Sequence, residues 1–216
     1  MNHDIRPVFQ QALGPDWDRL GDAIRRHYTM APHSNDHVCV RGTMHEVHHA
    51  PWAALLMPLG RLFGALVPYT GRAVPIEVHY RCRPDDPHLY WDRIFRFAGR
   101  APFHFRSHME HEAADGALVI EYVRFGIGMR LAVSAEEGAL VFRDRGYVWR
   151  LGRLRIPLPL GLLMGTAYVE ERPDPRDPDA FSMRMLLRHR WFGDVFRYSG
   201  SFRLPDDLPG DLLSDR

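Results

Sequence analysis

Lysine is absent from the chain, and arginine supplies all of its permanent positive charge. This absence excludes enzymes that form a Schiff base through a lysine amine, anchor pyridoxal phosphate, or hold nucleotide phosphates with a P-loop lysine. An excess of charge of one sign is also lacking, because 28 basic residues stand against 27 acidic ones. Without a basic excess to neutralise a row of phosphates, we expect no nucleic-acid partner.

Cysteine is scarce, with Cys39 and Cys82 far apart and outside any paired-cysteine motif. A zinc ribbon and a disulfide framework are therefore excluded, and unpaired cysteines are typical of a reducing compartment. The opening MNHDIRP lacks the basic and then apolar pattern of a signal peptide. These features predict a cytoplasmic location.

Long hydrophobic runs are missing too. The longest apolar stretch extends from Trp52 to Tyr69 and is interrupted by Pro58, Arg61 and Pro68. A helix needs about 20 consecutive apolar residues to span a bilayer. We therefore expect no transmembrane segment, although contact of this stretch with a membrane surface stays open.

The composition is that of a globular domain. The chain has 216 residues, of which 45% are hydrophobic and 12% aromatic. A chain of this size can bury roughly 70% of its unfolded surface in one core. We predict a single barrel-like domain over residues 1–204, followed by a loosely ordered tail at 205–216.

Helical periodicity is confined to the N-terminal third. Apolar residues between Pro7 and Tyr28 recur at three- and four-residue steps, with a break at Gly14 and Pro15. The stretch from Trp52 to Val67 has the same spacing, and Pro58 is expected to kink it. We predict two helical segments here.

From Val74 onward the period changes to two, the signature of strands with one buried face. Further strands are expected at 38–47, 89–97, 103–111, 118–125, 128–133, 139–149, 166–171, 181–191 and 195–204. The turn pair Glu137-Gly138 suits a tight hairpin. These patterns predict a mainly β (α+β) fold, an antiparallel meander of about eight to ten strands that forms a barrel or strongly curved sheet, with the helices packed on it. The apolar, proline-containing segment 154–165 is expected to act as a lid or plug across one end.

Several segments together resemble a known family. They are FQQALGPDWDRL, VCVRG, WDRIF, RFGIGMRL, IPLPLGLL and GDVFRYSGSFRL, and they span nearly the whole chain. In their order and spacing they resemble the bacterial DUF4166 family, a domain of unknown function found alone or attached to saccharopine-dehydrogenase-like oxidoreductases. The resemblance supports the domain limits and implies an oxidoreductase as a possible partner, but it supplies no mechanism.

Two charged residues interrupt apolar strand faces. In YWDRIFRF, alternation places Arg93 on the same face as aromatic residues, and in LVIEYVRF it places Glu121 in an apolar row. An ion removed from water needs a partner, so we predict an interior pair of Arg93 and Glu121. This pair either fixes strand register only or forms the floor of a cavity where Arg93 binds the carboxylate or carbonyl of a largely apolar ligand.

The candidate ligand-binding residues are completed by four neighbours of this pair, Trp91, Phe95, Tyr122 and Arg130. The leading functional hypothesis is a module that binds a hydrophobic or amphipathic small molecule or lipid inside the barrel. Two alternatives stay open. One is an isomerase, cyclase or lyase that uses acid-base residues in the same cavity, and the other is an accessory domain that docks on an oxidoreductase through 52–69.

Histidine is abundant, with 13 residues, yet its spacing does not predict a metal site. His45, Glu46 and His48 depart from the HExxH spacing, so we expect neither a metal nor a cofactor. His108 and Glu110 belong to the polar face of a strand that is expected to meet water. The acid-base alternative would require that face to point inward instead.

Overall fold

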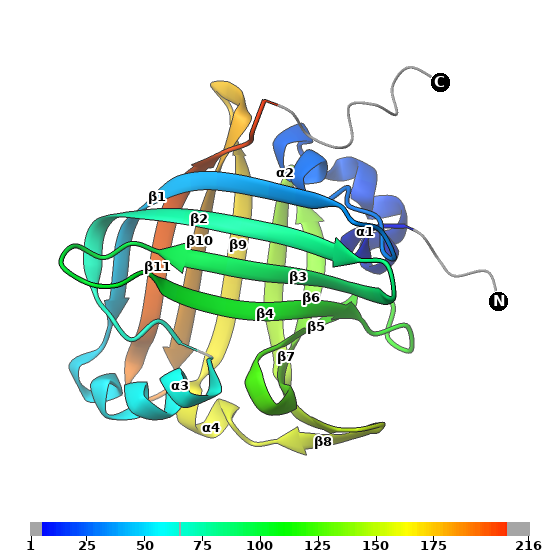
Figure 1. Ribbon diagram of the computed structural model, residues 1–216. Coiled ribbons are helices and arrows are strands. Elements are labelled where there is room, and N and C mark those ends of the chain that lie inside the picture. The colour runs from blue at the N-terminus through cyan, green and yellow to red at the C-terminus, as the bar shows by residue number, and fades with distance from the viewer. Residues whose placement is uncertain (1–5, 65, 207–216) are drawn as a thin grey trace, which may run out of the picture.

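A computed structural model describes residues 6–64 and 66–206, and its described part is dominated by β-strands (Figure 1). The strands are β1 His37–His49, β2 Gly71–Arg83, β3 Asp86–Phe95, β4 Phe103–His111, β5 Leu118–Tyr122, β6 Ile127–Glu136, β7 Ala139–Leu151, β8 Leu154–Leu158, β9 Thr166–Asp174, β10 Asp177–His189 and β11 Gly193–Arg203. The helices are α1 Val8–Leu13, η1 Gly14–Arg19, α2 Asp22–His27, η2 Pro51–Leu56, α3 Met57–Phe63, η3 Arg124–Gly126 and α4 Gly161–Met164. Of the tail predicted at 205–216, residues 207–216 lie outside the described part.

The sheet closes on itself. Its order is β6-β5-β4-β3-β2-β1-β11-β10-β9-β7-β8. An additional pairing of the edge strand β6 with β7 closes ten of these antiparallel strands into a ring. β8 stands outside this ring, paired with β7 alone among the described strands. The prediction of an antiparallel meander of eight to ten strands forming a barrel is confirmed.

The hairpin between β6 and β7 shows why local sequence closes the ring. Its two central residues, Glu137 and Gly138, have φ angles of 50° and 82°. Positive φ at both positions defines a type I′ turn, whose twist matches that of the flanking strands. The pairing of β1 with β11, by contrast, joins segments that are distant in the chain.

The two ends of the barrel carry different covers. Helices α1 and α2 and the η1 turn close the end where β2 turns into β3 and β6 turns into β7 (Figure 1). Helices α3 and α4 and strand β8 lie at the opposite end, in the connections β1–β2 and β7–β9 (Figure 1). Both predicted helical regions are therefore present, each as short pieces.

Pro58 does not kink a long helix. It is the second residue of α3, and the residues before it form the 3₁₀ turn η2. Proline is tolerated in the first turn of a helix because its missing N–H would have no partner there. Among the described residues, no helix has the length and apolar character needed to cross a membrane.

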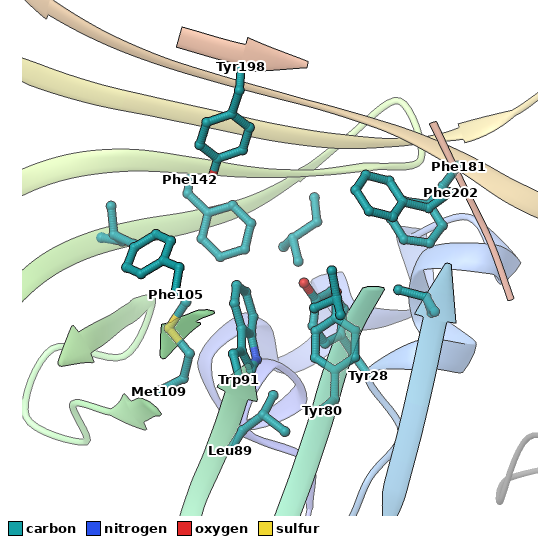
Figure 2. Packing of buried hydrophobic residues seen from close by; sticks show 14 of the residues in the cluster. Tyr28, Tyr80, Leu89, Trp91, Phe105, Met109, Phe142, Phe181, Tyr198 and Phe202 are labelled. Atoms are coloured by element: carbon teal, nitrogen blue, oxygen red, sulfur yellow. The ribbon is translucent and has the colours of Figure 1, made fainter. Parts of the chain in front are cut away.

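Aromatic side chains fill the half of the barrel next to the N-terminal helices (Figure 2). Phe9 of α1 enters this half and packs at ring-centroid distances of 4.5 Å from Tyr28 and 5.6 Å from Phe142. Tyr80 and Trp91, on β2 and β3, meet edge to face at 5.4 Å. The solid packing of this half sets the barrel's shape and leaves the remaining space at the other end.

Candidate ligand cavity

A cavity of about 310 Å³ lies at the end of the barrel covered by α3 and α4. Its size falls within the range of small-molecule pockets, about 300–1,000 Å³. The residues that line it are almost all apolar, and they are Gly60, Phe63, Leu66, Phe105, Glu121, Val123, Ile127, Gly128, Met129, Tyr147, Leu158, Leu160, Leu163, Met164, Met185 and Leu187.

The segment predicted to be a lid does cover this cavity. Leu158, Leu160, Leu163 and Met164 reach into it from the β8–α4 region. The helix ends at Gly165, whose φ is +83° and whose added Cβ would lie 2.2 Å from a backbone oxygen of β10. Only glycine fits there, so the backbone itself fixes where the lid meets the barrel.

The charged group on the cavity wall is Glu121, and three adjacent strands hold it. Arg93 on β3 donates through Nη2 to Oε1 of Glu121 on β5. Ser107 on β4 lies between them, accepting from Arg93 Nη2 at 2.5 Å and donating to Glu121 Oε1 at 2.7 Å. The predicted interior pair of Arg93 and Glu121 is therefore present, with a hydroxyl that bridges it.

The Glu121 carboxylate and the neighbouring rings keep Arg93 charged. Its exposed fraction is 6%, and burial alone would lower its pKa, but the adjacent Glu121 carboxylate outweighs this and raises the pKa above its ordinary value. The guanidinium carbon lies 4.0 Å from the Phe105 ring centroid and 4.9 Å from that of Trp91. The rings attract the cation and exclude water from the pair.

Arg93 faces away from the large cavity. Together with Trp91 and Phe95 it lines a separate space of about 20 Å³ on the filled side of the barrel. Its Nε is buried there without a hydrogen-bond partner among the described residues. Of the predicted pair, only Glu121 therefore lines the large cavity, and Arg93 supports it from behind.

The structure does not bring the two remaining candidates to the cavity. Tyr122 follows Glu121 in β5 and so points to the outer face, where its ring lies under the Arg150 guanidinium at 4.1 Å. Arg130 is also on the outer face and pairs with Glu112 at 3.0 Å. Adjacent residues of a strand point to opposite sides, which separates both of them from Glu121.

The histidine-rich face of β4 also points outward, away from the cavity. His108 stacks on Tyr122 at 5.3 Å and accepts from Arg150 Nη2 at 3.0 Å. His88 lies between two carboxylates, with Nδ1 2.6 Å from Asp86 and Nε2 3.3 Å from Glu110. These acid-base groups therefore form an external network that is separate from Glu121.

We expect this network to make the fold sensitive to acid. Burial lowers the pKa of His108 to about 4, and the charges of His88 and Arg150 act in the same direction. The unfolded chain takes up the proton near the ordinary value of 6.5 and the folded chain only near 4, so stability falls as the pH drops through this window.

NMR titration of the His108 ring should show no shift until the pH approaches about 4. In denaturant unfolding, His108→Gln should remove part of the loss of stability between about 6.5 and about 4. An unchanged acid slope in this variant would contradict the assignment.

Sequence reasoning missed two contributors to the interior. Ser107 was detectable, because it shares the inward row of β4 with Phe105 and Met109. Glu171 of β9 is buried beside His27 and accepts from the Tyr28 hydroxyl at 3.0 Å. It follows another glutamate in the chain, so alternation alone did not distinguish the inward one.

The fold and the cavity define this chain as a closed antiparallel β-barrel with an apolar site at one end. The family model described as Domain of unknown function (DUF4166) matches residues 20–202. The chain therefore belongs to the DUF4166 family, as the sequence resemblance predicted.

Comparisons with other proteins add little. No curated protein sequence matches at a significant level. Among solved structures, the chain is similar to an N-terminal dehydratase from the difficidin assembly line, with 6% identity, a TM-score of 0.21, and coverage of 83% of this chain and 96% of that one. An inactive CurJ dehydratase mutant in complex with a compound gives 7% identity, a TM-score of 0.18, and coverage of 74% and 84%. At these TM-scores neither likeness carries an argument about function.

Proposed function

We propose that this barrel binds a hydrophobic or amphipathic small molecule or lipid in the cavity under α3 and α4. The observation that carries the proposal is a cavity of about 310 Å³ whose lining residues are all apolar apart from Glu121 and Tyr147. An apolar pocket with one or two placed polar groups is the usual form of a site for such ligands.

Glu121 determines what the polar end of the ligand can be. An ionised carboxylate accepts hydrogen bonds and cannot donate them. Arg93 and Ser107 already donate to its Oε1, so the carboxylate serves as an acceptor in the structure. A ligand hydroxyl or amine could donate to it, whereas a ligand carboxylate would bring a second negative charge into an apolar site. We therefore replace the carboxylate ligand first expected for Arg93 by a ligand with a hydrogen-bond donor.

Fluorescence of N-phenyl-1-naphthylamine, an apolar probe with one N–H, tests this proposal. Its emission should rise on binding, and decanol should displace it at least about tenfold better than decanoate, because only the alcohol can donate to Glu121 at neutral pH. Mass spectrometry of an organic extract of the purified protein should also reveal a copurified apolar alcohol or amine.

The two competitors have the same chain length, so they differ only in the polar end. Preferential displacement by decanoate would overturn the assignment of Glu121 as the acceptor. Failure of the probe and of both competitors to bind would contradict the proposed function itself.

A further inference from the structure

Exposed apolar side chains gather at one end of the barrel. Within the described part of the chain, every large hydrophobic residue that is strongly exposed belongs to η2, α3, η3, the β7–β8 hairpin, α4 or the β10–β11 turn. These residues, which we call the apolar rim, are Trp52, Leu55, Leu62, Phe125, Trp149, Leu151, Leu154, Leu162, Leu163, Trp191 and Phe192. The rim surrounds the covers of the cavity, and among the described residues the end covered by α1 and α2 carries no such residue.

Contacts connect parts of the rim that lie far apart in the chain. The Trp52 ring packs on that of Phe192 at 5.3 Å. Trp149 Nε1 donates to the Phe125 carbonyl at 2.9 Å. His189, at the end of β10, has Nε2 3.0 Å from the Leu162 carbonyl of α4. Several of the exposed residues therefore lie against one another at this end of the barrel rather than at scattered single positions, and such a grouping marks an interaction site.

The segments that form the rim contain arginines, and the two glutamates that reach the β7–β8 hairpin, Glu110 and Glu112, are already paired with Arg150 and Arg155. An arginine directly precedes one exposed apolar residue in each of four segments, in the pairs Arg61-Leu62, Arg124-Phe125, Arg153-Leu154 and Arg190-Trp191. None of these four guanidinium groups pairs with a carboxylate of the described residues. The stretches 51–70, 122–133 and 145–169 contain no aspartate or glutamate at all. The nearest acidic residue in sequence is Asp194, which follows the β10–β11 turn.

We propose that the apolar rim docks on the surface of a membrane that contains anionic lipids. Exposed tryptophan, phenylalanine and leucine side chains enter the boundary between headgroups and acyl chains, while arginines contact the phosphates above it. The chemistry fits a lipid surface better than a second copy of the chain, because a copy would bring four further arginines against these four. Docking also sets the end of the barrel that holds the cavity against the phase in which an apolar ligand dissolves.

Flotation with vesicles tests the proposal on the full chain. The protein should float with vesicles of phosphatidylcholine and phosphatidylglycerol, and binding should weaken when salt is raised or phosphatidylglycerol is left out. Arg153→Gln with Arg190→Gln should reduce vesicle affinity roughly fivefold for each arginine. Leu162→Ser with Trp191→Ser should reduce it at least about tenfold.

Two controls separate docking from folding and from ligand binding. Arg176→Gln changes an exposed arginine in the β9–β10 turn, at the other end of the barrel, and should leave flotation unchanged. The Leu162→Ser, Trp191→Ser variant should still bind N-phenyl-1-naphthylamine, because neither side chain lines the cavity.

Two results would overturn the proposal. The first is absence of flotation with anionic vesicles, and this would leave the cavity proposal standing if the probe still bound. The second is a stable dimer in sedimentation experiments that Trp191→Ser dissociates, because the rim would then be covered by a second copy of this chain.

Discussion

Replacing Arg93 with methionine is expected to lower the free energy of unfolding by about 3 to 5 kcal/mol. The reason is that Glu121, which is only 9% exposed, would be left as a buried charge without its cation. The double variant Arg93→Met, Glu121→Leu should recover most of the loss, because no charge is then buried alone. Chemical denaturation at neutral pH measures both effects.

A surface pair provides the matched control. Arg197 donates to Glu46 at 2.9 Å, with both side chains more than 30% exposed. Arg197→Met should cost less than about 1 kcal/mol, since water screens such pairs. An Arg93→Met loss no larger than that of the control would contradict the view that the interior pair depends on both partners.

Replacing Met129 with tryptophan should weaken ligand binding without lowering stability. Met129 lines the cavity and pairs across the sheet with Glu121 and Tyr147, which line it as well. An indole at this position would occupy the space beside the carboxylate. We expect probe affinity to fall about hundredfold or more, because little apolar surface stays available to the probe. The free energy of unfolding should stay level or rise by roughly 0.5 to 2 kcal/mol, as for other cavity-filling changes.

Met129→Leu is the control, because it conserves volume and should leave probe binding and stability close to those of the original chain. Denaturation and probe titration of the two variants separate a filled pocket from a damaged fold. Undiminished probe binding in Met129→Trp would place the ligand elsewhere on the protein.

The strands and the interior ion pair could be predicted because both depend on a period of two. Alternation places Arg93 and Glu121 on the inward face whatever lies next to them, and a buried ion then requires its counter-ion. Tyr122 and Arg130 show the limit of choosing residues by nearness in sequence. Tyr122 is one residue from Glu121 in β5, so its side chain points to the other side of the sheet. Arg130 on β6 pairs with Ile120, which is also one residue from Glu121, so it too points to the outer face.

The position of the cavity could not be predicted in the same way. Strand patterns identify inward side chains but not how far they fill the barrel along its axis. That depends on the N-terminal helices, which insert Phe9 among the rings at one end only. Arg93 and Glu121 lie where the filled part meets the open part, so each borders a different space. Only the tertiary arrangement shows that Glu121 is the residue a ligand would meet.

The unfilled half of the barrel has a thermodynamic consequence of its own. Removing side-chain volume from an apolar interior typically destabilises a protein by about 24 cal/mol for each Å³ left empty. By that measure, a space of this size forgoes on the order of several kcal/mol that larger residues at its wall could supply. A chain selected for stability alone would accumulate bulkier side chains at lining positions such as Val123 and Met185. Selection for ligand binding would preserve such a cavity despite its cost in stability.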